Sequence, residues 1–408
     1  METTTKVRGE KLLRLVSLLF AAGILAFLFL NAALTLLLRR EETSYYENRR
    51  LADKPILTGE GLMNGDSGRA LDAWVQDHSA GRNTFLRLRT LLDMKLLRRP
   101  VVNETVVRED VLLPLQDFWM YSRAELADSA ALAADRVAAH ARRAEEFGGR
   151  YYYVAVPHQA MAFGEDYPPY LQSHTDFYGD IAELFGEALA AREVPFLDMG
   201  AVLREEGLLR EVSSRIDNHY SILGAYETYR RILERLRADT GWDLDILEEG
   251  EYRIETLPNH YLGSRNRKLF DLWPSEEKLM LLFPLEEVGF LRRDRADWLA
   301  SPIESREVYS LPASPEEPVS YSLYMGGDWP ATEIDTDRPE KPDILVYGDS
   351  FTNGVECILW HGFDTMYSFD FRHYTEKTLD ELIEELRPDA VICIRDYEAL
   401  IRTEGNGQ

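Results

Sequence analysis

The sequence predicts an α/β fold with three α/β/α layers and a central parallel sheet. Three observations lead to this class. Apolar strand-like runs alternate with helical patterns, and one of these apolar runs ends in Gly-Asp-Ser. More than a hundred residues before that tripeptide, a turn that contains a histidine leads into a helical pattern. A strand, helix, strand succession requires crossover connections, which make the strands parallel and place helices on the sheet faces. In such sheets ligands bind beyond the carboxyl ends of the strands.

The first element is an uncleaved transmembrane signal anchor, predicted over residues 15–38. These 24 residues carry no charged side chain, and at about 1.5 Å per residue they span roughly 36 Å, enough to cross a bilayer. A cleaved signal usually has a shorter apolar region followed by small residues, and Ala32-Ala33 leaves cleavage open as an alternative. Basic residues precede the segment, so residues 1–14 are expected in the cytoplasm and the rest of the chain outside.

The later elements follow in two halves. Residues 39–120 are expected to form a membrane-proximal subdomain with an amphipathic stretch around 70–97. Residues 121–240 form the first half of the α/β domain, residues 241–340 an insertion of mainly short strands and loops rich in proline, and residues 341–408 the second half. Helical spacing and apolar runs predict helices over 123–147, 176–192, 221–237 and 375–386, and strands over 151–156, 195–199, 343–347 and 390–394.

Composition indicates a folded chain with an acidic surface. The 408 residues are 45% hydrophobic and 29% charged, which allows a large core. The net charge of −25 argues against a nucleic-acid partner, because phosphate backbones are bound by clustered Lys and Arg. The two cysteines, Cys357 and Cys393, either pair or remain buried thiols.

Two separated fragments supply the parts of a Ser-His-Asp site. Asp217-Asn218-His219-Tyr220 stands just before a helical pattern that Ser221 can cap, and Gly348-Asp349-Ser350-Phe351 ends an apolar strand. A serine hydroxyl becomes a good nucleophile when an imidazole accepts its proton and a carboxylate orients that imidazole. We therefore expect Ser350 as the nucleophile, His219 as the base and Asp217 as the orienting acid. The alternative is a serine that merely caps the strand.

The strand before Ser350 carries this inference, since the chain holds a second Gly-Asp-Ser at 65–67 that follows no strand and is read as a polar loop. Asp370 and His373 form an alternative acid and base, in the order found in ordinary secreted lipase-esterases of the SGNH type. Only 20 residues separate Ser350 from Asp370, which we take as too few to complete the remaining strands and return to the site. The pair at 217 and 219 is therefore preferred.

Further residues are assigned to the rim of the site. His158 follows a strand end and can line the pocket. The second residue after Ser350 is not glycine, which disfavours an α/β-hydrolase nucleophile elbow. No cluster of His, Asp or Glu has the spacing of a metal site, so neither a metal nor a cofactor is expected.

At these residues the chain resembles the DHHW family of bacterial proteins and, more distantly, the alginate O-acetyltransferase proteins, both SGNH-hydrolase-like. The resemblance extends from about Glu47 to Leu400. Asp217-Asn218-His219-Tyr220 stands where the Asp-His-His-Trp of the family's name would stand, with Asn and Tyr replacing its second and fourth residues. The other matching segments, in order, are Glu47–Ala52, Asp77-His78 with Arg82, Tyr324–Asp328, Gly348–Ser350 and Asp370–Arg372.

The resemblance implies an SGNH-like fold and carries the family's Asp, His and Ser over to Asp217, His219 and Ser350, in an order that the alginate proteins share. It implies an extracytoplasmic O-acyltransferase, an O-acetyltransferase in the first instance, that modifies a cell-surface polysaccharide through an acyl-serine. Tyr220 replaces a residue expected at the substrate, and Arg372 is a second oxyanion donor beside the backbone N–H of Ser350, or a substrate contact.

An outward-facing enzyme of this kind needs an acyl donor from across the membrane. Acetyl-coenzyme A is cytosolic, so the resemblance implies a membrane-bound partner that passes the acyl group, as in the alginate system. A glycan esterase or deacetylase with the same triad is the alternative function. A third is a non-catalytic glycan-binding or assembly protein.

Overall fold

The computed structural model describes residues 2–37, 41–47, 49–115, 121–171, 175–402 and 405–407. These residues divide into two compact units. One holds Met1–Arg99 with Arg267–Leu272, and the other holds Pro100–Asn266 with Trp273–Gln408. Asn48, which belongs to the first segment of the family resemblance, lies outside the described residues.

The first unit is mainly helical. Its elements are α1 (Glu2–Leu37), β1 (Thr43–Ser44), β2 (Arg49–Arg50), α2 (Gly59–Asn64), α3 (Asp66–His78), α4 (Arg82–Leu91) and the π-helical turn η1 (Leu92–Leu96). Within the part of the chain that the structure describes, Leu13–Leu37 of α1 is the one helical stretch long and apolar enough to cross a membrane. This finding agrees with the predicted span at 15–38.

The second unit is built on an eight-stranded mixed sheet with the order β11-β10-β12-β14-β13-β15-β6-β7. Five neighbouring strands, from β14 to β7, are parallel, and β12, β10 and β11 add antiparallel partners at one edge. The strands are β6 (Arg150–Val156), β7 (Phe196–Asp198), β10 (Leu291–Arg295), β11 (Ile303–Ser305), β12 (Ala331–Asp335), β13 (Ile344–Gly348), β14 (Thr365–Phe369) and β15 (Ala390–Asp396). The central strands β13 and β15 are buried throughout, as strands covered on both faces must be.

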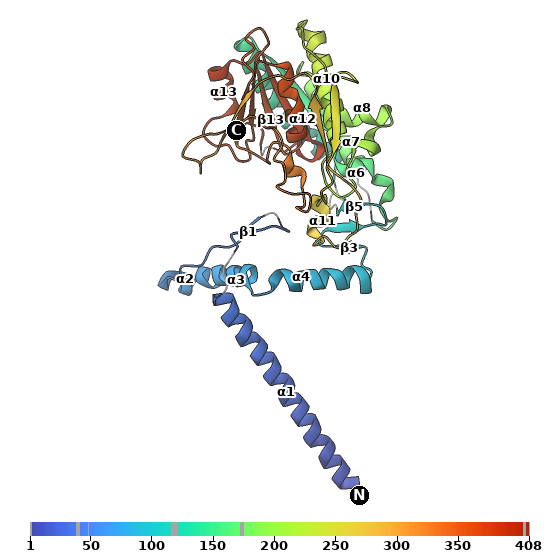
Figure 1. The fold of residues 1–408 in the computed structure, drawn as a ribbon, viewed down its shortest axis with the longest axis vertical. Helices are drawn as coiled ribbons and strands as arrows, with labels where there is room; N and C mark the ends of the chain where they lie inside the picture. The colour runs from blue at the N-terminus through green and yellow to red at the C-terminus, as the bar shows by residue number, and fades with distance from the viewer. Residues whose placement is uncertain are drawn as a thin grey trace. The chain divides into compact units, whose positions relative to one another are not determined.

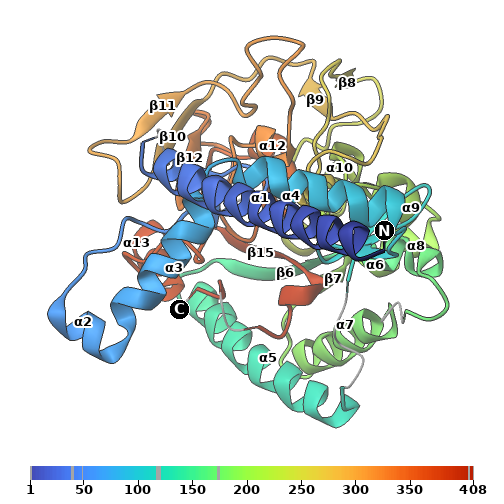
Figure 2. The ribbon, with the colours of Figure 1, turned by 90° about the horizontal axis from the view of Figure 1, so that it is seen from below.

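Helices cover both faces of this sheet, which confirms the predicted three-layer class. The pair α5 (Arg123–Glu146) and α7 (Thr175–Ala190) packs side by side on one face together with α13 (Leu379–Leu386), and α10 (Ile222–Thr240) packs against α12 (Thr352–Leu359) on the other. Figure 1 shows the order of these elements along the chain, and Figure 2 shows α5 and α7 on the opposite side of β6 from α10 and α12.

The sequence signals for helix ends are mostly used as expected. Gly241 directly follows α10, and Gly148 follows the C-cap residue Phe147 of α5; both adopt left-handed backbone angles. Thr378 and Glu381 form a reciprocal capping box at the start of α13, so this helix begins later than the predicted residue 375. Ser221 holds the N-cap position of α10 without a capping hydrogen bond.

The region 241–340 contributes more to the domain than the predicted insertion would. It contains a separate two-stranded antiparallel sheet of β8 (Tyr252–Thr256) and β9 (Met280–Pro284), but its strands β10, β11 and β12 extend the central sheet. The helix α12 after Ser350 and the strand β14 were also not predicted.

The remaining elements are β3 (Val101–Val102), β4 (Thr105–Val107), β5 (Leu112–Pro114), α6 (Gln159–Ala162), η2 (Gly164–Asp166), α8 (Met199–Glu205), α9 (Leu209–Val212), β8 (Tyr252–Thr256), α11 (Ser264–Lys268), β9 (Met280–Pro284), η3 (Tyr321–Leu323), η4 (Trp360–Gly362) and η5 (Tyr397–Ala399).

Candidate active site

Ser350 lies in the turn between the buried strand β13 and helix α12, at the carboxyl edge of the parallel strands. Gly348 makes this turn possible, since a Cβ at this position would collide with the Ile394 carbonyl of the neighbouring strand β15. Only glycine allows the two backbones to approach so closely. The strand therefore presses the Ser350 turn against the end of β15.

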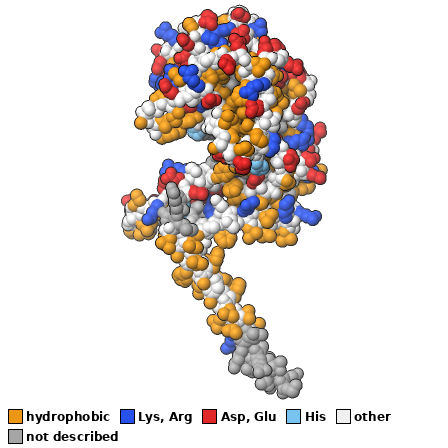
Figure 3. All heavy atoms as spheres, viewed as in Figure 1, with side chains coloured by type: hydrophobic (Ala, Val, Ile, Leu, Met, Phe, Trp, Pro, Cys, Tyr) orange, Lys and Arg blue, Asp and Glu red, His pale blue; other side chains and the backbone are white. Residues whose placement is uncertain are grey.

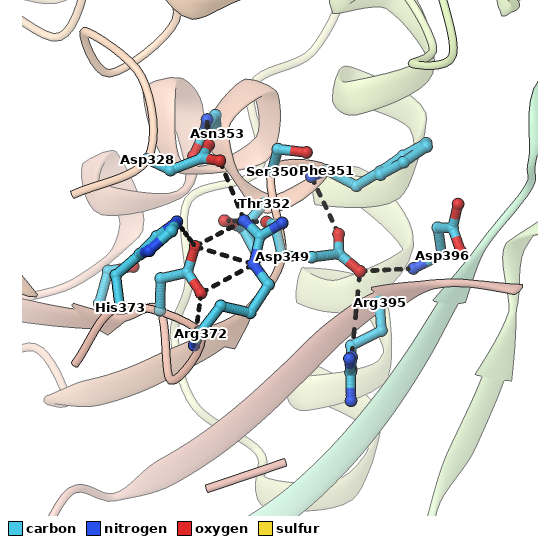
Figure 4. A network of polar contacts seen from close by, with 12 residues as sticks. Asp328, Asp349, Ser350, Phe351, Thr352, Asn353, Arg372, His373, Arg395 and Asp396 are labelled. Carbon is cyan, nitrogen blue, oxygen red and sulfur yellow. Dashed lines mark hydrogen bonds and ion pairs between the residues drawn. The ribbon is translucent and has the colours of Figure 1, made fainter. Parts of the chain in front are cut away.

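Asp349 fixes the conformation of the turn. One carboxylate oxygen accepts a hydrogen bond from the Phe351 N–H at 3.0 Å, and the other accepts one from the Asp396 N–H at 3.2 Å, at the end of β15. Figure 4 shows these contacts, together with the Arg395 guanidinium on the same carboxylate. The middle residue of Gly-Asp-Ser thus ties two strand ends together and leaves the Ser350 hydroxyl to other partners.

The two fragments singled out in the sequence meet at this edge. His219 Nε2 lies 2.8 Å from Ser350 Oγ, and His219 Nδ1 lies 2.6 Å from Asp217 Oδ1. The expected juxtaposition across 131 residues is therefore present. With Nδ1 donating to the carboxylate, Nε2 is free to accept the serine proton, which is the arrangement a serine nucleophile needs.

Asp217 is held as a buried carboxylate by three N–H donors. Besides the imidazole, its oxygens accept hydrogen bonds from the backbone N–H of His219 at 3.1 Å and from that of Ser264 at 2.6 Å. Burial raises the pKa of this carboxyl, but the nearby His219 and the N–H donors outweigh burial and lower the pKa below its usual value. The carboxylate stays ionised and keeps one tautomer of His219.

Ser264 was not predicted to belong to the site. It is the first residue of α11, and its hydroxyl also accepts a hydrogen bond from the Asn218 N–H at 3.2 Å while donating to Asn218 Oδ1 at 2.7 Å. The only sequence signal was a Gly-Ser pair before a short helical pattern, which does not point to a partner 47 residues earlier.

The imidazole of His219 lies between two aromatic rings. Tyr321 stacks on it almost parallel, with ring centroids 3.7 Å apart and planes at 5°, and the Phe351 ring lies 4.6 Å away. Tyr321 comes from η3, in the region that was expected to be an insertion. These rings fix the tilt of the imidazole, which the Asp217 hydrogen bond alone leaves free.

Tyr220 is placed differently from its expected position at the substrate. It is buried, and its hydroxyl donates to the Phe351 carbonyl at 2.5 Å while its ring packs edge-on against Phe351. Tyr220 thus connects the turn that holds His219 to the turn that holds Ser350. In this structure its side chain supports the two turns.

Arg372, the expected second oxyanion donor or substrate contact, is bound by two carboxylates. Its Nε donates to Asp370 at 2.9 Å, and its Nη2 donates to Asp328 at 3.0 Å. Asp328 also accepts a hydrogen bond from Asn353 Nδ2 at 2.9 Å, in the first turn of α12, so the network runs from Arg372 to the helix that follows Ser350 (Figure 4). Burial acts to lower the pKa of Arg372, but the two carboxylates raise it above its usual value.

The alternative pair at 370 and 373 does not contact Ser350. Half of the His373 side chain is exposed, and its Nε2 lies 4.0 Å from Asp370. The reason given against this pair was nevertheless wrong, because 20 residues do suffice to return to the site: α12 and β14 fit between them, and β14 pairs directly with β13. Asp370 therefore stands at the same sheet edge as Ser350, where it holds Arg372.

His158 lies at the carboxyl end of β6, and among the described residues no contact joins it to Ser350. Its Nδ1 accepts a hydrogen bond from the Ala160 N–H at 3.2 Å, its Nε2 lies 3.7 Å from Glu398, and its ring stacks on Tyr178. Burial lowers the pKa of His158 to about 4, so the imidazole is neutral near pH 7. Its contacts make it part of the packing beneath this edge.

Among the residues that the structure describes, two groups of side chains each bring three possible metal ligands together. They are His158, Asp396 and Glu398, and Asp328, Asp370 and His373. In each group an arginine stands beside a carboxylate: Arg402 lies 3.9 Å from Glu398, and Arg372 binds both Asp328 and Asp370. In both groups the arginine already supplies the positive charge that a metal ion would bring to the carboxylates.

Other sequence expectations have simple outcomes. The first Gly-Asp-Ser follows no strand, as expected, but the prediction of a polar loop was wrong, because Asp66 and Ser67 begin helix α3. Ser67 is buried, and its hydroxyl accepts a hydrogen bond from the Thr58 N–H. Both cysteines are buried free thiols.

Comparison with known proteins supports the SGNH-like fold. Residues 113–280 match the family model described as the SGNH hydrolase-like domain of the acetyltransferase AlgX. This match includes Asp217 and His219 and ends before Ser350. The observed fold and this match over part of the chain agree with the SGNH-like fold that the sequence resemblance implied. No curated protein matches the chain.

Among solved structures the chain is similar to PatB1 of Bacillus cereus. The TM-score is 0.62 at 18% sequence identity, over 72% of this chain and 96% of that one. It is also similar to a DHHW family protein from Eubacterium siraeum, with a TM-score of 0.54 at 17% identity, over 75% of this chain and 95% of that one. At these identities the likeness shows a shared fold, which agrees with the resemblance to the DHHW family.

Proposed function

We propose that this protein is an extracytoplasmic O-acyltransferase, in the first instance an O-acetyltransferase, that modifies a cell-surface polysaccharide through an acyl-Ser350 intermediate. The observation that carries the proposal is the continuous relay from Asp217 through His219 to Ser350, with contacts of 2.6 and 2.8 Å. The match to an acetyltransferase family model over residues 113–280 supports acyl chemistry.

The proposed reaction has two half-reactions with one proton shuttle. Ser350 Oγ attacks the carbonyl carbon of the acyl donor while His219 Nε2 takes its proton, and the protonated imidazole then returns that proton to the leaving group. A sugar hydroxyl next attacks the acyl-serine, with His219 again accepting and then returning a proton, which regenerates the Ser350 hydroxyl. Asp217 stabilises the imidazolium in both halves and remains ionised.

The negative charge that develops on the carbonyl oxygen needs donors near Ser350. Among the described residues no partner is found for the Ser350 N–H, which lies just before the first turn of α12. A backbone N–H at a helix N-terminus suits an oxyanion. We assign this group to the oxyanion hole, whereas Arg372 contributes by holding Asp328 and the start of α12.

The acyl donor and the topology belong to the proposal as well. With α1 in the membrane and the N-terminus in the cytoplasm, the active site faces outward, and a membrane-bound partner must deliver the acyl group. The acceptor is proposed to be a glycan of the cell surface. Transfer differs from hydrolysis only in which hydroxyl attacks the acyl-serine.

The test uses the full chain in detergent with 4-nitrophenyl acetate, with and without added oligosaccharides. We expect an acetyl group on the Ser350 peptide in a mass spectrum, and acetylated oligosaccharide as the product. Ser350→Ala should abolish both while leaving the circular dichroism spectrum unchanged. Ser67→Ala, in the other Gly-Asp-Ser, is the matched control and should retain full activity.

Three other outcomes separate the alternatives. Free acetate without acetylated oligosaccharide, from any acceptor tried, would indicate an esterase. A protein that neither acetylates Ser350 nor reacts there with a sulfonyl fluoride would be non-catalytic; this reagent class is chosen because PatB1 has been solved with a sulfonyl adduct. Unchanged transfer by Ser350→Ala would remove the mechanism.

A further inference from the structure

The amphipathic stretch predicted around residues 70–97 plays no part in the proposed reaction, yet it exposes a row of large apolar side chains. On α4 and η1, Phe85, Leu88, Leu92 and Leu96 follow at intervals of three, four and four residues and are between 44% and 72% exposed. Such spacing places them along one side of the helix. A folded, soluble surface rarely leaves so long an apolar row uncovered.

Contacts within the first unit show which way this row faces. Asn31 Nδ2 of α1 donates to the Ala80 carbonyl at 2.8 Å, and the Ala80 N–H donates to Thr35 Oγ1 at 2.9 Å. These bonds fasten the turn between α3 and α4 to the last turns of the apolar stretch Leu13–Leu37. Helix α3 therefore ends, and helix α4 begins, at the level where that stretch would leave a bilayer.

The apolar row points toward the depth of the stretch. The Phe85 ring contacts the Phe27 ring edge-on, with centroids 6.0 Å apart. Phe27 precedes Thr35 by eight residues, or about 12 Å along α1. Since Phe85 reaches toward the apolar stretch, Leu88, Leu92 and Leu96 on the same side face the same way.

The adjoining helix α3 continues this surface. Leu71, Val75 and Trp74 of α3 line an apolar groove of about 800 Å³ together with Phe27, Leu28, Ala32 and Leu36 of α1. Figure 1 shows α2, α3 and α4 in a row across the end of α1, and Figure 3 shows hydrophobic side chains along α1 and on the side of this row nearest to it.

The charge of the segment is opposite to that of the whole chain. Residues 87–99 contain five basic residues and one acidic residue, Asp93, a net charge of +4 within a chain of −25. Asp93 is buried and is shared by Arg89 and Arg99. An apolar row flanked by arginine and lysine is the pattern of a helix that lies in the headgroup region of anionic lipids.

We infer that α3, α4 and η1 lie flat on an anionic lipid bilayer, with the Phe85, Leu88, Leu92, Leu96 side immersed below the headgroups. The first unit is then a membrane-surface platform as well as an anchor. The inference rests on α1 crossing the membrane and is independent of the chemistry at Ser350. A protein partner on the same face is the competing occupant.

The test is collision accessibility of nitroxide labels on the full chain in nanodiscs of phosphatidylcholine and phosphatidylglycerol. Labels are attached at Leu88→Cys, Leu92→Cys and Leu96→Cys, since the native Cys357 and Cys393 are buried and should not react. Leu25→Cys in α1 reports the membrane interior, and Arg87→Cys, on the opposite side of α4, is the matched aqueous control. We expect the three leucine positions to favour oxygen over a water-soluble nickel chelate by at least several-fold relative to position 87.

Each other outcome overturns part or all of the inference. Leucine labels as accessible to the nickel chelate as position 87 would exclude immersion, and shielding from both reagents would indicate a protein on this face. A water-exposed label at position 25 would remove the premise. Equal depth in discs of phosphatidylcholine alone, or in the variant with Arg87, Arg89, Arg98 and Arg99 changed to Gln, would exclude the requirement for anionic lipid. Because no arm measures acyl transfer, failure of the proposed function would leave these results standing.

Discussion

At the scale of single residues, the orientation of His219 depends on a tyrosine that no motif contains. Tyr321 stacks on the imidazole at 3.7 Å, and its buried hydroxyl has no hydrogen-bond partner among the described residues. A buried hydroxyl without a partner costs about 1–3 kcal/mol of stability. The Tyr321 ring therefore orients His219, whereas the Tyr321 hydroxyl lowers the stability of the fold.

This separation predicts opposite effects for two substitutions. Tyr321→Phe keeps the stack and should retain acyl transfer within about twofold, with stability unchanged or raised by about 1 kcal/mol. Tyr321→Ala frees the imidazole to tilt and should lower kcat by about 10- to 100-fold. Steady-state kinetics with 4-nitrophenyl acetate and urea unfolding measure the two effects. Equal losses in both variants would show that the hydroxyl, not the stack, matters.

The sequence identified the three residues that are proposed to react, and the structure brings them together, but the residues that orient them were not identified. Asp217, His219 and Ser350 stand in short motifs whose chemistry is recognisable without a structure. Tyr321 and Ser264 act through a ring face and a backbone N–H, which almost any sequence can supply. Only the fold decides that these groups face the site.

At the scale of elements, the first N–H of α11 anchors the acid of the relay. Ser264→Pro removes this N–H, although proline is well tolerated at the first position of a helix. A lost hydrogen bond to a carboxylate costs about 1.5–3 kcal/mol, so kcat/KM should fall by about 10-fold or more. Ser264→Ala keeps the N–H and loses only the hydroxyl contacts to Asn218, so it should stay closer to the wild-type rate. If the alanine variant is as slow as the proline variant, the hydroxyl is the important group.

The strand pair β13 and β15 sets the position of the Ser350 turn through Gly348. Gly348→Ala places a Cβ against the Ile394 carbonyl, and we expect a loss of about 3 kcal/mol or more in unfolding free energy, because backbone on both sides prevents relief. Gly179→Ala is the matched control: this position lies in α7 with open space around it, and alanine should stabilise the helix by roughly 0.5–1 kcal/mol. Urea titration of both variants tests the pair, and a Gly348→Ala protein as stable as wild type would contradict the packing argument.

Four strands of the central sheet were predicted from apolar runs, whereas β10, whose buried positions carry charge, was not. The strands β6, β7, β13 and β15 appear where apolar runs predicted them. Strand β10 was not predicted because its inward positions are Arg292 and Asp294. These two residues form a buried ion pair at 2.9 Å, and Asp294 also accepts a hydrogen bond from Thr332 on β12. A strand whose core face is charged looks like a loop in the sequence, which is why the region 241–340 was read as an insertion.

At the scale of the whole molecule, stability and acid sensitivity are linked through the packing beneath the active-site edge. His158 is buried there, and its pKa is lowered to about 4 from an ordinary value of 6.5. Burial is the largest cause; Glu398 partly opposes it, and Arg265, His219 and Arg402 add to it. The imidazole therefore stays neutral in the folded protein over a pH range in which the unfolded chain takes up a proton.

This difference makes the folded state less stable in acid. Between pH 6.5 and about 4 the unfolded chain binds up to one more proton at this site than the folded protein, so the contribution of His158 to the free energy of unfolding rises with pH across that window and is flat above it. The full contribution is about 3 kcal/mol. His158→Gln removes the titration while its side chain can still accept a hydrogen bond from the Ala160 N–H. Urea unfolding of the full chain in detergent at pH 4.5 and 7 should show a smaller pH dependence in the variant than in wild type. Identical pH dependence in both proteins would mean that His158 does not stay neutral in the fold, and that the acid response comes from other titrating groups.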